Sequence, residues 1–254
     1  DDPYRDVRIA AGKALGRIGT FTVGGNIKKN LQSERPEVRE AAVQALLSMD
    51  NLTGEIILKA FTNPDPKVRV TAIMMVNNRD PKMITSALLK ALLDEDWQVR
   101  KVAAETLGST LSSEAVKPLV DLCDDENMWV RYSAACSLQN ISFLPESERR
   151  FALDKLVHLL EKDDDSVKIS ALESLAKIGD PTALRSIIKI AASKNDDLRR
   201  LTAEALGQFS GREVEAKLMK LSGDISAPVR EAADQSLAKV RHEFSPKFKR
   251  QMGE

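Results

Sequence analysis

Apolar and small residues recur along this chain with helical spacing, in repeats of nearly constant length. A Val-Arg pair or a close variant marks each repeat, and we number the repeats one to eight from these anchors. The anchors are Val7-Arg8, Val38-Arg39, Val68-Arg69, Val99-Arg100, Val130-Arg131, Val167-Lys168, Leu198-Arg199 and Val229-Arg230. Successive anchors lie 31, 30, 31, 31, 37, 31 and 31 residues apart. Such a period predicts a stacked array of repeats rather than one closed globular core.

Each anchor opens an amphipathic helix. When the anchor valine is position 0, positions 4, 8 and 11 are mostly apolar and position 7 is small, as in Val99, Ala103 and Leu107. These positions share one face of a helix with 3.6 residues per turn. Good N-cap residues stand three positions before the anchors, where their side chains can accept from free backbone N–H groups. They are Asp65, Asp96, Asn127, Asp164, Asn195 and Ser226.

A leading helix is predicted before each of these second helices. Residues 81–93, 114–123 and 181–192 are rich in Leu, Ile and Val, and Asp80-Pro81 and Asp180-Pro181 supply a cap followed by proline. Each repeat is therefore predicted to be a helical hairpin. The fold class that follows is all-α, a right-handed α-solenoid of about eight hairpins.

The repeat resembles the short HEAT-like repeat of phycobilisome lyases and many other bacterial and archaeal proteins. The segments that carry this resemblance are DPKVRVTAIMMV, DEDWQVRKVAAETLGS and GDPTALRSIIKIAASKNDDLRRLTAEALGQFSG. The signatures of ankyrin and tetratricopeptide repeats are absent from the sequence. The resemblance covers nearly all of the chain and implies the fold, but it does not imply one function, because function resides in sites carried by a fold.

One continuous array is expected over residues 1–243, with the first repeat lacking its leading helix. Residues 244–254 are expected to form a basic C-terminal tail or the start of a further truncated repeat, because Ser245-Pro246 has the form that opens leading helices elsewhere. The chain begins at Asp1, only six residues before its first anchor. We therefore expect a segment of a longer protein.

Composition argues against several classes of function. Lys+Arg and Asp+Glu both number 38, so the formal net charge is zero, whereas a surface devoted to nucleic acid normally has a basic bias. Cys123 and Cys136 lack the spacing of metal ligands and favour reduced thiols in the cytoplasm. The sequence contains no apolar run long enough to span a membrane, and no membrane partner is expected.

Catalytic chemistry has little support in the sequence. The two histidines, His158 and His242, are expected to be structural or exposed. His242-Glu243 is the type of pair that HEAT-like di-iron hydroxylases repeat four times, but one pair cannot supply a complete metal site. The Asp163–Asp165 run is interpreted as a solvated turn and helix cap, with a cation site as the alternative. We expect no catalytic residue, metal or cofactor.

The recurring arginine at position 1 has two interpretations. It could form a row of phosphate-binding groups, or it could bridge the turn of its own repeat to the turn of the next. Acidic turns lie beside it, as at 94–96 and 124–126. The carboxylates of these turns favour the bridging interpretation, because a guanidinium group can pair with a carboxylate and with carbonyl oxygens at once.

The exposed stripe of the second helix comprises positions 2, 6, 9 and 10 and is predicted to line a concave face. Most of the stripe is charged, but the middle repeats carry apolar, aromatic and amide side chains typical of an interface centre. The predicted partner-binding residues are Val70, Met74, Asn78, Trp97, Lys101, Trp129, Tyr132, Cys136, Asn140 and Ile169. For Trp97 and Trp129 an equal alternative is that they seal the seams between repeats.

The one break in the period falls at 141–150, where six extra residues lengthen either a loop or the following leading helix. Such an insertion can mark a binding face or can be a tolerated surface insertion.

Taken together, these observations predict a non-enzymatic scaffold that binds a protein or peptide. The alternatives are an accessory subunit of a bilin lyase-type complex, which the resemblance implies, and a nucleic-acid-binding module.

Overall fold

The structure is a computed structural model of the chain. It describes residues 29–31, 33–47, 60–74, 81–109 and 112–243, and the single residues at 7, 10, 14 and 58. Asn78, most of the first repeat and the tail 244–254 lie outside these residues. The described residues contain helices, turns and bends but no strand, which confirms the all-α class.

Two compact units divide the chain, Asp1–Leu107 and Gly108–Glu254, and the boundary falls in the last turn of α7. The single array over 1–243 and its right-handed course stay predictions. The first unit contains α3 (Pro36–Leu47), α5 (Pro66–Met74), α6 (Pro81–Ala91) and most of α7 (Trp97–Ser109). In it, α3 packs against α5, the second helix of the next repeat.

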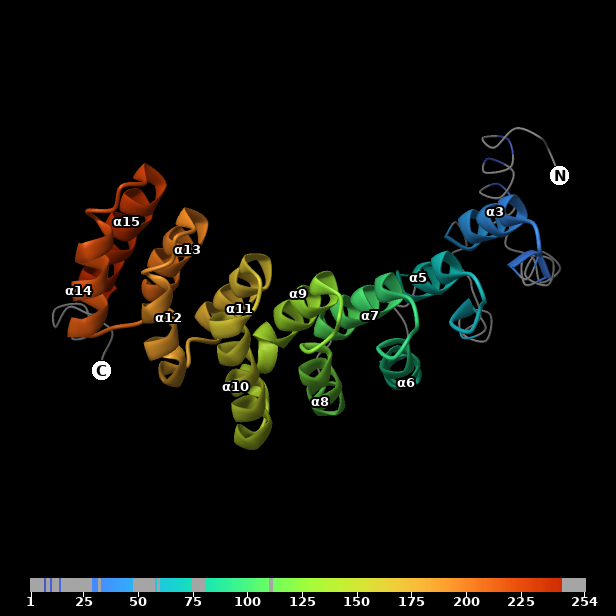
Figure 1. The fold of residues 1–254 in the computed structure, drawn as a ribbon. Coiled ribbons are helices and arrows are strands. Elements are labelled where there is room, and N and C mark those ends of the chain that lie inside the picture. Colours follow the sequence, from blue (N-terminus) through green and yellow to red (C-terminus); the bar gives the residue numbers. More distant parts are fainter. Residues whose placement is uncertain are drawn as a thin grey trace. The chain divides into compact units, whose positions relative to one another are not determined.

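The second unit contains the remaining helices, of which Figure 1 labels the α-helices. They are α8 (Ser113–Leu122), α9 (Met128–Ser137), the 3-10 helix η1 (Leu138–Phe143), α10 (Glu146–Lys162), α11 (Asp165–Ile178), the 3-10 helix η2 (Pro181–Ala183), α12 (Leu184–Ile190), α13 (Asp196–Leu206), α14 (Arg212–Leu221) and α15 (Ala227–Glu243). Each leading helix packs against the second helix that follows it, as predicted: α8 on α9, α10 on α11, α12 on α13 and α14 on α15.

The second helices of this unit also pack on one another in chain order, α9 on α11, α11 on α13 and α13 on α15, and the leading helices α8, α10 and α12 follow the same order. The predicted apolar positions form the core between these two layers. Ala134, Leu138, Ala171, Leu175 and Leu206 are all completely buried. The periodic pattern is therefore the buried face of each hairpin.

The six-residue insertion lengthens a leading helix. The helix α10 has 17 residues, whereas α8 has 10. A short 3-10 helix, η1, joins α9 to Leu144, whose side chain is buried, and α10 starts after Pro145. Of the two predicted alternatives, a longer loop or a longer leading helix, the structure shows the longer helix.

Most of the predicted N-caps make the expected side-chain bond, and one, Asp164, stands at the N-cap of α11 without making it. The side chains of Asp65, Asp96, Asn127 and Asn195 accept hydrogen bonds from backbone N–H groups in the first turn of their helices. The Asp164 carboxylate instead accepts from Nη2 of the repeat-five arginine at 2.9 Å, so a contact between repeats has replaced a contact within one.

Candidate functional site

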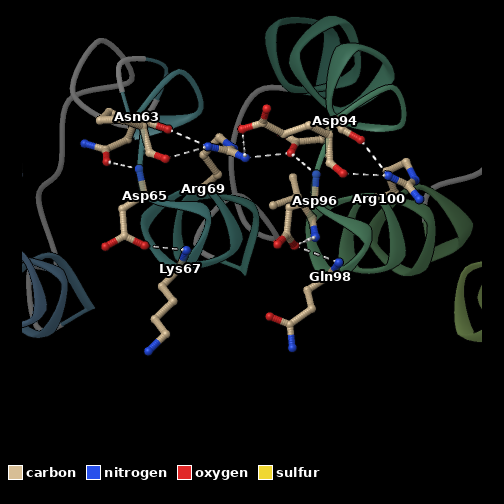
Figure 2. A network of polar contacts seen from close by, with 11 residues as sticks. Asn63, Asp65, Lys67, Arg69, Asp94, Asp96, Gln98 and Arg100 are labelled. Carbon is tan, nitrogen blue, oxygen red and sulfur yellow. Dashed lines mark hydrogen bonds and ion pairs between the residues drawn. The ribbon is translucent and has the colours of Figure 1, made fainter. Parts of the chain in front are cut away.

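The arginine at position 1 is tied to the turn that precedes its own helix. In Figure 2, Arg69 Nη1 donates to the backbone oxygens of Asn63, at 2.8 Å, and of Pro64, at 3.2 Å. Arg100 makes the same pair of bonds to Asp94 and Glu95. The same pair of bonds recurs in four more repeats, at Arg39, Arg131, Arg199 and Arg230. These arginines therefore close the turn between the two helices of a repeat.

The guanidinium groups of Arg39, Arg69, Arg131 and Arg199 also reach the turn of the next repeat. Arg69 Nη2 lies 2.7 Å from Asp94 Oδ1 (Figure 2), and Arg199 forms a two-bond fork with Asp224 at 2.8 and 2.9 Å. Arg131 forms a corresponding fork with Asp163. The bridging interpretation is confirmed, and these arginines are engaged within the protein rather than presented to a phosphate.

The aspartate that pairs with the arginine also accepts a backbone hydrogen bond within its own turn, which the sequence analysis did not predict. Asp94 Oδ1 accepts from the backbone N–H of Asp96, and Asp224 Oδ1 accepts from that of Ser226, both at 2.9 Å. These residues stand at position −5. A residue that can accept such a bond recurs there in most repeats: Ser33, Asn63, Asp94, Asp125, Ser193 and Asp224. That recurrence is the signal that could have identified them.

The ion pairs fix the charge of these carboxylates. The hydrogen bonds from Arg199 hold the pKa of Asp224 below its ordinary value of 3.8. For Asp163, burial acts to raise the pKa, but hydrogen bonds from Arg131 and from the Asp164 N–H lower it further than burial raises it. A carboxyl with a depressed pKa contributes stability above its unfolded pKa and loses that contribution as the pH falls through its folded pKa. The bridges are therefore complete at neutral pH.

The seam between α11 and α13 lacks this bridge. Repeat six has Lys168 at position 1, and repeat seven has Ser193 at position −5. Lys168 instead pairs within its own helix, 3.7 Å from Asp165. The seam is linked by Asn195 Nδ2, which donates to Asp165 Oδ2 at 2.9 Å. Cation and anion are replaced together here, which indicates that they work as a pair.

The predicted binding residues of the first unit occupy the exposed or half-buried side of their helices. Met74 is 61% exposed at the end of α5, and Val70 and Trp97 are half-buried. Lys101 pairs with Glu105, four residues later, at 2.8 Å. Each side chain has some surface accessible to a partner.

In the second unit the predicted residues come together around an aromatic pair. The rings of Trp129 and Tyr132 meet edge to face, with centroids 6.1 Å apart and planes at 64°. Trp129 is nevertheless 47% exposed. Their spacing of three residues places them on one side of α9, and Cys136 continues that row one turn later.

The neighbouring helix α11 borders this row. Ser170 Oγ donates to the backbone oxygen of Tyr132 at 2.8 Å and lies 3.3 Å from Cys136 Sγ. Ile169, the residue before it, is half-buried. We call Trp129, Tyr132, Cys136 and Ile169 the aromatic surface. Asn140 differs from them, because it lies in η1 and its Nδ2 donates to the backbone oxygen of Gly108 at 3.3 Å.

The described residues offer no metal site, since no group of three His, Cys, Asp or Glu side chains is placed to hold an ion. The side chains of His158 and His242 are exposed. Cys123 is buried, and burial raises the pKa of its thiol to about 12, so it is protonated at neutral pH and unsuited to be a nucleophile. No helix in the described parts of the chain is long and apolar enough to cross a membrane.

Comparison with known proteins agrees with this geometry. HEAT repeats match residues 53–139 and 141–204. The chain belongs to the HEAT repeat family. This HEAT protein is 28% identical over 205 residues to the uncharacterized phycocyanin operon protein Z of Pseudanabaena tenuis, an alignment that covers 77% of this chain and 98% of the relative.

Solved structures of low sequence identity share the fold. The crystal structure of YibA from Escherichia coli has a TM-score of 0.71 and 19% identity, covering 95% of this HEAT protein and 89% of YibA. A designed armadillo repeat protein in complex with the peptide (KR)4 has a TM-score of 0.53 and 18% identity, covering 72% of this chain and 98% of the designed one. Both likenesses support a helical-repeat solenoid.

Proposed function

We propose that this HEAT segment is a non-enzymatic scaffold that binds a protein or peptide along the outward side of its second helices. In the second unit the binding site is the aromatic surface. One observation carries this proposal: Trp129 leaves 47% of its surface in water although its ring is held against Tyr132. Exposed Trp and Tyr side chains are enriched at interface centres and are common hot spots.

The aromatic pair suits a binding role for a physical reason. The edge-to-face contact restricts both side chains before a partner arrives, so less conformational entropy is lost on binding. Val70, Met74, Asn78, Trp97 and Lys101 are proposed as a corresponding surface of the first unit. The designed armadillo protein of similar fold was solved with a peptide, which supports the general mode of binding.

The test is a comparison of two exposed aromatic residues. A peptide binder selected on the purified wild-type protein should lose about 1 kcal/mol or more of binding free energy when Trp129 becomes alanine. The control is Phe151→Ala, because Phe151 is 46% exposed but lies on the leading helix α10. Isothermal titration calorimetry should give wild-type affinity for this control.

The free energy of unfolding of both variants, measured by thermal denaturation, should stay within about 0.5 kcal/mol of the wild-type value, as is usual for surface substitutions. If Trp129→Ala unfolds the protein, the residue belongs to the core and the aromatic surface is misassigned. If selected binders tolerate Trp129→Ala as well as Phe151→Ala, the proposed site is wrong.

A second candidate function comes from the relative named phycocyanin operon protein Z. Its alignment spans 98% of that protein, and the phycobilisome-lyase resemblance points in the same direction. On this proposal the chain is an accessory subunit that handles a bilin or a phycobiliprotein. Mixing the protein with a free bilin should then shift and sharpen the visible absorbance band. An unchanged spectrum at saturating protein, with and without a phycobiliprotein subunit, would rule it out.

We propose a cytoplasmic location, because two cysteines without the spacing of metal ligands are typical of reduced thiols. Nucleic acid remains the least favoured partner because the chain has no net positive charge.

A further inference from the structure

The aromatic surface lies next to a set of outward-facing carboxylates. The helix α9 carries one charged side chain, Arg131, which is engaged with Asp163. The next two second helices are acidic, and five of their carboxylates are exposed. These are Asp165 and Glu173 on α11, and Asp196, Asp197 and Glu204 on α13.

Contacts between the helices connect these acids to the aromatic pair. Ser170 touches both the Tyr132 backbone and Cys136, so α11 lies directly beside the aromatic row. Glu173 follows Ser170 by three residues on the same helix and is exposed. The bond from Asn195 to Asp165 continues the surface onto the start of α13.

The basic side chains of these two helices do not neutralise the region. Arg200 lies between two carboxylates, 2.6 Å from Glu204 and 3.8 Å from Asp197, so one positive charge is shared by two acids. Arg199 is paired with Asp224, which leaves Lys168 and Lys177 as the other basic residues of α11 and α13. Lys177 is in the last turn of α11, roughly 18 Å along the helix from its first residue. On these two helices the five exposed carboxylates therefore outnumber the three cations that are not paired with Asp224, namely Arg200, Lys177 and Lys168, which pairs with Asp165.

We propose that the partner bound by the aromatic surface is an extended segment rich in arginine or lysine. This inference rests on the proposed function and adds the chemistry of the partner. A guanidinium or ammonium group would stack on the exposed face of Trp129, where the ring quadrupole attracts cations. Further basic side chains would pair with Glu173 and with the acids of α13, and this complementarity would select basic segments over neutral ones.

The experiment uses fluorescence anisotropy of labelled decapeptides of alternating arginine and alanine, with a glutamate–alanine peptide as the acidic counterpart. The arginine peptide should bind saturably and the glutamate peptide should not. The triple variant Glu173→Gln, Asp197→Asn, Glu204→Gln should weaken binding of the arginine peptide about tenfold or more, and the effect should shrink in high salt. Trp129→Ala should weaken it to a similar degree.

The matched control is the triple variant Glu146→Gln, Asp154→Asn, Glu213→Gln. It removes the same net charge from exposed acids of the leading helices and should bind like the wild type. Arg200→Gln should change the affinity in the opposite direction. Because it removes the cation shared by Asp197 and Glu204, it should tighten binding of the arginine peptide. Circular dichroism melts establish that each variant is folded.

The inference is overturned if both peptides bind equally, or if the two triple variants weaken binding to the same extent. It is also overturned if a selected partner that depends on Trp129 carries no cationic residues, and in that case the proposed function survives. If neither the arginine peptide nor any selected partner depends on Trp129, the proposed function fails as well.

Discussion

Replacing Arg199 with alanine should destabilise the protein by about 3 kcal/mol, near the lower end of the range for breaking a buried ion pair. The side chains of Arg199 and Asp224 are only 11% and 12% exposed, and the arginine also satisfies the backbone oxygens of Ser193 and Lys194. Its removal leaves a nearly buried carboxylate without its counter-ion and two carbonyl groups without this donor. Urea unfolding followed by circular dichroism at 222 nm measures the loss.

The neighbouring arginine is the matched control. Arg200 lies on the same helix and bonds to Glu204 four residues later, but its side chain is 33% exposed. A pair of this kind contributes about 0.3–0.5 kcal/mol, so Arg200→Ala should lower the stability only slightly. Equal losses for the two variants would show that the bridge between repeats contributes no more than a surface ion pair.

The hairpins could be predicted from the sequence because each repeat carries the same pattern of apolar and small positions. A single amphipathic stretch leaves the position of a helix ambiguous, but eight aligned copies separate the buried positions from incidental apolar residues. The burial of Ala134 and Ala171 at position 4 follows from that alignment. The role of the position 1 arginine was also predictable, because acidic turns lie beside it in the sequence, as at 94–96 and 124–126.

The details that escaped prediction depend on contacts between repeats. Asp164 has the sequence of an N-cap, yet Arg131 takes its carboxylate, and nothing within repeat six reveals that competition. The contact of Trp129 with Tyr132 fits their spacing on one helix, but that spacing does not give the exposed fraction of Trp129, which is 47%. Asn140 has an amide side chain of the kind found at interfaces. That amide donates to the backbone oxygen of Gly108, so it makes a contact within the fold.

Close packing between second helices leads to the prediction with the other large effect. Gly108 stands at position 9 of repeat four, and a Cβ there would lie 2.6 Å from Cβ and 2.7 Å from Cα of Ser137, at position 7 of the next repeat. Because backbone atoms are involved, α9 must shift to admit a methyl group. Gly108→Ala should cost about 2–3 kcal/mol of stability, as overpacking does, even though alanine is the better helix former.

A graded series of glycines tests whether the helix contact is the cause. At Gly207 a Cβ would meet Ser236 Oγ at 2.9 Å, a side-chain atom that can turn away, and at Gly223 the nearest atom would be 3.5 Å distant. The loss of stability on substitution with alanine should therefore fall from Gly108 to Gly207 and vanish at Gly223, measured by urea unfolding. Adding Ser137→Gly to Gly108→Ala should recover part of the loss, since it removes the Cβ and Oγ contacts but leaves the close Cα. If Gly223→Ala costs as much as Gly108→Ala, or if Ser137→Gly recovers nothing, the approach of α9 to the end of α7 does not set the stability of this seam.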